Sequence, residues 1–216
     1  MSGSGTSGDA TAGVPAESAE SIRAFIQAIE PMKSHVRSAW TADGVPESVA
    51  AHSWRLCMLA LVVGRLVDGV DPLRLLEICL VHDLGEAIHG DVPAPDQSET
   101  PDRHAQERSA VTELTALVGG AAGERIRELW DEYDSGKSVE AATAKALDKI
   151  ETIIQHNQGA NPDGFDYRFN LDYGRTIPIT SALIRSLRAI VDNDTAARAS
   201  ESAENGTGDA PRNRPS

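Results

Sequence analysis

Apolar residues recur every three or four positions along most of the chain, which is the spacing of one face of an α-helix. The first run ends before Pro31 and consists of Ile22, Phe25, Ile26 and Ile29. Further runs fit helices at about 47–67, 121–133, 138–157 and 178–192. No stretch shows the apolar–polar alternation of a half-buried strand. We therefore predict an all-α fold, a helical bundle of six or more helices.

Two further helices are indicated by a capping residue followed by proline, a common start signal. Asp71-Pro72 begins the mostly apolar stretch LRLLEICLVHDLGEAI. Thr100-Pro101 begins a helix that reaches about Val118. The apolar character of the first stretch predicts that this helix is buried in the core.

The two ends of the chain lack any helical periodicity. Residues 1–17 consist largely of Gly, Ser, Thr and Ala, and residues 195–216 look similar. Such segments bury too little apolar surface to offset the entropy lost on ordering. We expect disordered termini at 1–17 and 195–216 around a single domain at 18–194, a length that supports one hydrophobic core.

The stretch 158–177 differs from the helical runs. It reads QGANPDGFDYRFNLDYGRTI and contains Gly, Pro, Asn and most of the Tyr and Phe of the chain. This composition is typical of a structured loop over a helical body. The loop is either a packing flap or a site lid or dimer contact, and the sequence leaves these alternatives open.

The formal net charge is -13, which excludes a broad basic surface for nucleic-acid polymers. A small anionic substrate stays possible, because one metal ion and one arginine can reverse the local field. The two cysteines, Cys57 and Cys79, lie in apolar runs and form no CxxC pair, as expected of free thiols in a reducing compartment. No apolar run reaches the ~18–20 residues of a membrane span, and the N-terminus lacks the features of a signal peptide. We infer a cytoplasmic location.

The segment CLVHDLGEAIHGD at 79–91 carries the strongest chemical signal. His82 and Asp83 stand side by side at the end of the most apolar helix. Burying an imidazole beside a carboxylate is costly unless something compensates. A divalent metal does so, since Mn, Fe, Co, Ni and Zn accept both groups and Mg accepts the carboxylate. The alternative is that His82 caps the helix and Asp83 is a solvated turn residue.

Two more candidate ligands lie on other predicted helices. His52 lies in ESVAAHSWRLCMLAL and Asp148 in AKALDKIETIIQ. Taken alone, His52 is a core or rim histidine, and Asp148 is a surface charge or a partner of Lys145. Taken with His82 and Asp83, they supply four ligands that a helical bundle can bring to one ion.

This order of His, then His-Asp, then Asp resembles that of the HD-domain superfamily of metal-dependent phosphohydrolases. The wider context is similar to the small 5'-deoxynucleotidases of that superfamily. The matching pieces are VRSAW (36–40), PESVAAHSWR (46–55), CLVHDLGEAIHGD (79–91), RHAQERSAV (103–111) and ALDKIETIIQ (146–155). The resemblance spans about residues 20–190, and its most specific part is the His-Asp block with its trailing Glu and Gly-Asp.

The resemblance implies a role for each matching residue. The metal ligands would be His52, His82, Asp83 and Asp148. Glu86 would act on the attacking water or the leaving oxygen, and Asp91 would be a second acidic residue of the site. Without the resemblance, Glu86 is a surface glutamate and Asp91 a turn residue before Pro93.

The resemblance also implies two substrate contacts. Arg37 would hold the phosphate, for which a planar guanidinium is suited because it donates two hydrogen bonds. Trp40 falls near the place where these enzymes contact the sugar. We therefore expect Arg37 and Trp40 to bind the substrate.

We expect one divalent metal ion, chosen from Co, Mn, Mg, Ni, Zn or Fe. Some HD proteins bind two metals through extra histidines between the His-Asp pair and the last Asp, and His89 and His104 lie in that interval here. In the two-iron oxygenases of the superfamily these histidines are more widely separated. A single ion therefore remains our prediction.

The predicted function is hydrolysis of (deoxy)nucleoside 5'-monophosphates to nucleoside and phosphate by an enzyme that resembles the 5'-deoxynucleotidases. The alternatives are an HD-fold phosphohydrolase acting on another small phosphate ester, a non-catalytic nucleotide-binding module, and a two-iron oxygenase. Similar phosphohydrolases are often homodimers, and that resemblance is the reason to expect a homodimer here. The expected partner is a small phosphorylated substrate, not a nucleic-acid polymer or a membrane.

Overall fold

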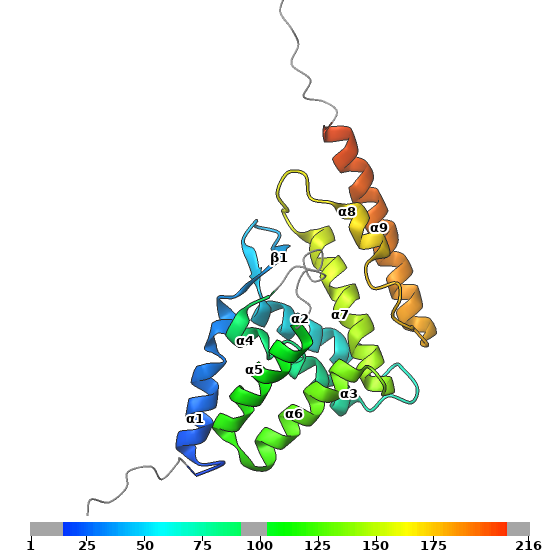
Figure 1. The fold of residues 1–216 in the computed structure, drawn as a ribbon. Coiled ribbons are helices and arrows are strands. Elements are labelled where there is room, and N and C mark those ends of the chain that lie inside the picture. The colour runs from blue at the N-terminus through cyan, green and yellow to red at the C-terminus, as the bar shows by residue number, and fades with distance from the viewer. Residues whose placement is uncertain (1–14, 92–102, 207–216) are drawn as a thin grey trace, which may run out of the picture.

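Helices account for most of residues 15–91 and 103–206, which are the residues described by this computed structural model (Figure 1). The helices are α1 (Ala19–Ala28), α2 (Val49–Val63), α3 (Pro72–Val81), α4 (Glu86–His89), α5 (Arg103–Val118), α6 (Gly120–Ser135), α7 (Val139–Gln158), α8 (Tyr167–Asp172) and α9 (Ala182–Gly206), with a 3-10 turn, η1, at Glu30–Lys33. The all-α prediction is confirmed. The predicted start at Thr100-Pro101 and the predicted tail residues 1–14 and 207–216 lie outside the described residues.

α7 is the central helix of the core. It packs against α2, α3, α6 and α9, and in Figure 1 it runs between the α1–α5 side of the molecule and the α8–α9 side. Its buried stripe consists of Ala144, Leu147, Ile150 and Ile153. Leu56 of α2, Ile78 of α3, Trp130 of α6 and Ile184 of α9 belong to the same hydrophobic cluster. The core is therefore mainly aliphatic, which agrees with the 4% aromatic content of the sequence.

Side-chain caps define where several helices begin. Ser48 accepts a hydrogen bond from the amide of Ala51, and Ser138 accepts one from the amide of Ala141. Asp71 accepts from the amides of Leu73 and Arg74, as its place before a proline predicts. These caps fix the N-terminal ends of α2, α7 and α3, the three helices that supply the candidate ligands or lead into them.

The helical bundle also contains one short sheet, which no alternating pattern in the sequence indicated. A short antiparallel sheet pairs β1 (Val36–Trp40) with β2 (Pro46–Ser48), and Val36 faces Ser48 in its register. The turn between the strands contains Asp43 and Gly44, and Gly44 has a φ of 76°. Asp-Gly is a common hairpin signal, but the strands are too short to show alternation. The predicted helix start at about Glu47 is corrected to Val49 for the same reason.

The predicted C-terminal tail from residue 195 is corrected in its first part, since residues 195–206 are helical. α9 continues to Gly206, and Thr195 is fully buried. The side chain of Asn157 in α7 donates a hydrogen bond to Thr195 (2.9 Å), and Arg198 donates to the carbonyl of Asn157 (2.9 Å). Polar contacts with α7 thus extend a helix whose own sequence has little apolar periodicity. No helix among the described residues combines the length and apolar character needed to cross a bilayer.

Candidate metal centre

Three separate parts of the fold bring the candidate ligands together. His52 lies one turn after Val49 and one turn before Leu56, so it shares the buried face of α2 and is fully buried. α3 ends at Val81, and the predicted longer helix is interrupted by a turn before α4 begins. His82 and Asp83 occupy the start of that turn.

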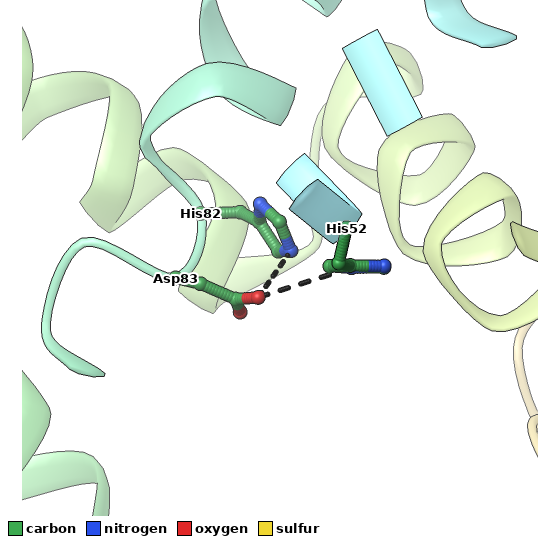
Figure 2. A group of neighbouring side chains, drawn as sticks. All are labelled: His52, His82 and Asp83. Carbon is green, nitrogen blue, oxygen red and sulfur yellow. Dashed lines mark ion pairs between the residues drawn. The ribbon is translucent and has the colours of Figure 1, made fainter. Parts of the chain in front are cut away.

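The interatomic distances define one cluster. His82 Nε2 lies 2.9 Å from Asp83 Oδ2, and His52 Nε2 lies 3.8 Å from the same oxygen. Figure 2 shows the two imidazoles and this carboxylate directed toward one another. Asp148 of α7 joins through its Oδ1 atom, which lies 3.2 Å from His52 Nε2. The structure therefore brings together all four residues that the sequence singled out.

The unused nitrogen atoms of this cluster fit a metal ion. His82 Nδ1 donates a hydrogen bond to the carbonyl of Cys79 (2.8 Å), which leaves the lone pair on Nε2. His52 Nδ1 is paired with Glu151 in the same way. Among the described residues both Nε2 atoms are buried without a hydrogen-bond partner. Two imidazole lone pairs beside carboxylate oxygens form a donor set that suits a divalent transition metal, with the outer hydrogen bonds orienting the rings.

The electrostatics favour positive charge at this point. Burial and the Arg37 guanidinium would lower the pKa of His52, but the carboxylates of Asp148 and Glu151 raise it to about 9. Burial would raise the pKa of Asp83, but His82 and His52 lower it to about 2. The carboxylates thus stabilise a cation between them, whether a proton or a metal ion.

A cavity of about 190 Å³ opens beside the cluster. This is well above the ~30 Å³ that one water occupies in the liquid, so an ion and a small ligand fit together. The lining includes His82, Asp83 and Asp148, together with four cationic side chains, Arg37, Arg103, Lys145 and Lys149. The same lining also includes six acidic side chains, so groups of both charges face the cavity, and the four cations are available to an anionic group.

Comparison with known proteins assigns the fold to a family. The sequence profile described as HD domain matches residues 29–188, most of the chain. The chain belongs to the HD-domain family.

Relatives of this HD-domain protein include named enzymes. The 5'-deoxynucleotidase HDDC2 of Homo sapiens is 31% identical over 196 residues, which cover 85% of this chain and 92% of that protein. The 5'-deoxynucleotidase HDDC2 of Dictyostelium discoideum is 32% identical over 139 residues, covering 61% of this chain and 73% of that protein. A solved structure described as a predicted metal-dependent phosphohydrolase from Magnetospirillum magnetotacticum MS-1 has a TM-score of 0.61 at 22% identity, covering 86% of this chain and 93% of that one. This last similarity concerns the fold alone.

Glu86 and Asp91 of the HD domain both line the cavity. Glu86 is buried at the start of α4, and its carboxylate lies 3.4 Å from Arg103. Burial raises the pKa of Glu86 to about 10, helped by the carboxylates of Asp83 and Asp91. Burial is also the main cause of the raised pKa of Asp91. Both carboxyl groups are therefore placed to hold a proton close to the ligand cluster.

Arg37 reaches the cavity from β1, whereas Trp40 does not. The guanidinium of Arg37 donates to Glu47 (3.1 Å) and Thr152 (3.0 Å), which fixes its position. Trp40 is not among the described residues that line the cavity, and its ring meets Phe165 edge-on at 6.2 Å. The structure thus brings one of the two predicted substrate contacts to the site and leaves the other outside it.

Sequence reasoning missed several residues around the HD-domain ligands. Glu151, one turn after Asp148, pairs with both His52 and Arg55, the latter at 2.6 Å. The sequence does indicate Glu151, because its carboxylate interrupts the apolar stripe of α7 one turn beyond Asp148, a candidate ligand. The hydroxyl of Tyr133 donates to Asp148 Oδ2 (3.1 Å), and Lys149 lies 3.0 Å from the same oxygen. No motif indicated the tyrosine, since its contact depends on how α6 packs against α7.

Two groups of metal-ligating side chains occur among the described residues, and neither includes His89 or His104. The second group consists of Glu47, His52 and Glu151. Each of its carboxylates has its own guanidinium, Arg37 or Arg55, so these residues form an ion-pair network behind the ligand cluster. His104 is largely exposed and pairs with Asp134.

Proposed function

We propose that this HD-domain protein is a metal-dependent phosphomonoesterase that hydrolyses (deoxy)nucleoside 5'-monophosphates to nucleoside and phosphate. The observation that carries the proposal is the convergence of His52, His82, Asp83 and Asp148, with two imidazole lone pairs facing carboxylates beside a cavity that four cationic side chains help to line. The relatives named as 5'-deoxynucleotidases support the choice of substrate. The four residues would hold one divalent ion, Co, Mn, Mg, Ni, Zn or Fe.

The chain's own residues then take distinct roles. When bound, the ion would supply a lowered pKa for an attacking water and neutralise charge on the phosphoryl group. Arg37, fixed by Glu47 and Thr152, would orient the phosphate through its guanidinium. Glu86 would take the proton of the water or give one to the leaving oxygen, because burial keeps its carboxyl able to hold a proton near neutral pH.

The roles of Asp91 and Trp40 follow from their positions. Asp91 shares the cavity with Glu86 and would adjust its proton affinity as a second acidic residue. Trp40 packs on Phe165 of the 158–177 segment, so it would contact the sugar or base only at the outer edge of the site. Loss of turnover in Asp91→Asn supports the first role. An unchanged Michaelis constant in Trp40→Leu would remove the second.

The deciding experiment is a phosphate-release screen of purified protein. Deoxy- and ribonucleoside monophosphates are compared with other small phosphate esters, each with Co, Mn, Mg, Ni and Zn. We expect Asp83→Ala to lose both metal and turnover, and Glu86→Ala to lose turnover while keeping metal. Absence of phosphate release from every nucleotide, with metal bound, would refute the proposal and favour a binding module. Two irons per chain with oxygen-dependent turnover would identify an oxygenase instead.

We also propose a homodimer. α2 carries an exposed apolar stripe at helical spacing, formed by Trp54, Met58, Leu61 and Val62, and Leu73 and Leu80 of α3 are exposed as well. Apolar side chains repeated along exposed faces are typical of protein interfaces. Light scattering coupled to size exclusion tests this directly, since Trp54→Glu should convert a dimer to a monomer. A monomeric wild-type protein would refute it.

A cytoplasmic location is proposed as well. Cys57 and Cys79 are both free thiols, which fits a reducing compartment. Fluorescence imaging of a tagged chain in its source cell would test this, and an extracellular signal would contradict it.

A further inference from the structure

Tyr173 lines the catalytic cavity although it belongs to the 158–177 segment, whose role the sequence left open. It directly follows α8 and precedes the approach to α9. The segment is therefore more than a cover on the outside of the bundle, because one of its side chains forms part of the cavity wall.

Tyr173 meets Lys149, a cation of the same wall. The Lys149 Nζ atom lies 4.9 Å from the centroid of the Tyr173 ring and 3.0 Å from Asp148 Oδ2. An ammonium group has three N–H donors. The carboxylate and the aromatic ring thus both contact the ammonium, and Lys149 also lines the cavity.

Gly174 packs against the stem of the same lysine. Its φ is +72°, and a Cβ at this position would lie 2.7 Å from Lys149 Cγ and 2.9 Å from its Cβ. This spacing leaves no room for a larger residue. The backbone of the segment therefore rests directly on Lys149.

Arg188 of α9 fixes this segment from outside the cavity. It is buried, and its guanidinium donates to the carbonyls of Tyr173 (2.8 Å), Asn170 (3.2 Å) and Leu171 (3.4 Å). Its Nε also donates to Asp192 (2.7 Å), which orients the guanidinium. Arg188 is not among the described residues that line the cavity. Its donors nevertheless satisfy the carbonyl groups at the end of α8.

We propose that Arg188 is a positioning residue that sets phosphate affinity through Tyr173 and Lys149. Lys149 would be the second cation on the phosphate, on a different part of the wall from Arg37. The segment 170–174 would hold the Lys149 ammonium in place. This inference rests on the proposed function in so far as it takes a phosphate group as the ligand.

The first test measures the binding of inorganic phosphate by calorimetry in the presence of Mg²⁺, without turnover. Arg188→Met removes the charge and the donors but keeps an unbranched apolar stem. We expect about ten-fold weaker binding, as for loss of one charge-assisted hydrogen bond to phosphate. Arg185→Met is the matched control, because Arg185 lies on the same helix and donates to the carbonyls of Ile179 and Thr180 instead. It should bind phosphate as the wild type does.

A double-mutant cycle separates positioning from general damage. If Arg188 acts through Lys149, Arg188→Met should weaken phosphate binding by less than about two-fold in a Lys149→Met background. Equal losses of phosphate affinity in both backgrounds would overturn the proposal, because a purely structural role of Arg188 would weaken binding equally in each. An unchanged phosphate affinity in Lys149→Met alone would also overturn it.

A second pair of variants tests the aromatic contact without touching the buried arginine. Tyr173→Leu should weaken phosphate binding several-fold, and Tyr173→Phe should restore most of it, because the ring face is kept. Equal phosphate affinity in the wild type and Tyr173→Leu would refute the role of this segment in positioning Lys149. These binding measurements stand apart from the phosphate-release screen, so a protein that binds phosphate through Lys149 yet hydrolyses no nucleotide would contradict the proposed function and leave this inference intact.

Discussion

His52 Nε2 lies 3.2 Å from Oδ1 of Asp148, although the two residues come from distant parts of the sequence. The other oxygen of Asp148 is already engaged, since Tyr133 donates to it at 3.1 Å and Lys149 lies 3.0 Å away. Asp148 therefore presents a single oxygen to the imidazole. This arrangement leads to the first prediction, because that oxygen is the one available to an ion.

Asp148→Asn should lose most of its metal affinity. The amide keeps the shape of the side chain but removes the negative charge that faces His52. We expect a loss larger than the about 10–100-fold that removing an outer partner of a ligand costs. Metal content after dialysis and calorimetric titration with Mn²⁺ measure it. Asp131→Asn is the control, since Asp131 pairs with Arg108 away from the cluster, and equal metal binding in the two variants would contradict the assignment.

Glu151→Gln should weaken metal binding although Glu151 is not itself one of the four candidate ligands. Glu151 is paired with His52 Nδ1 and so holds the ring with Nε2 toward the cluster. Loss of such a partner costs about 10–100-fold in metal affinity. Glu140→Gln is a matched change on the same helix, because Glu140 accepts a hydrogen bond from the backbone of Asp71 instead. If both variants bind metal as the wild type does, Glu151 has no part in the centre.

Arg37→Ala should raise the Michaelis constant for a nucleoside monophosphate. A charged hydrogen bond of this kind is worth ~1.5–3 kcal/mol, which corresponds to roughly a ten- to hundred-fold change. Steady-state kinetics on the best substrate of the screen gives the value. Arg125→Ala serves as the control, since Arg125 pairs with Glu77 on the surface. An Arg37 variant with unchanged Michaelis constant and turnover would not be a substrate contact.

Glu132→Gln should destabilise the fold at neutral pH and have little effect in acid. Burial would raise the pKa of Glu132, but hydrogen bonds from Arg74 and Ser138 lower it below its ordinary value of 4.5. A carboxyl with a lowered folded pKa stabilises the fold above its unfolded pKa and loses this contribution as the pH falls through the folded pKa. Arg74 is partly exposed, so we expect a cost of about 1 kcal/mol at pH 7.

Urea unfolding at pH 7 and in acid below the folded pKa of Glu132 measures this difference. The gap between wild type and Glu132→Gln should narrow as the pH falls. Glu113→Gln is the control, because Glu113 is an exposed residue of α5. A gap that stays constant across this range would mean that the Arg74 pair contributes no pH-dependent stability.

The helical class and the order of the ligands were available from the sequence. Helical periodicity and helix capping depend on residues that are close in sequence, so Asp71-Pro72 predicted the start of α3 correctly. Patterns between near neighbours did not predict the elements that depend on contacts between distant residues. β1 and β2 are too short to alternate visibly, and α9 continues past residue 195 because Asn157 and Thr195 meet across two helices.

Local features of the sequence, helix periodicity and the His-Asp block, were enough to predict the helical class and to single out the four candidate ligands. The packing of the helices places Glu151 against His52 and Tyr173 at the cavity, and it leaves Trp40 outside the cavity lining. The physical reason is that such contacts join residues far apart in the chain. Their distances follow from how α2, α6, α7 and α9 pack, and the spacing of residues along a single helix carries no information about that packing.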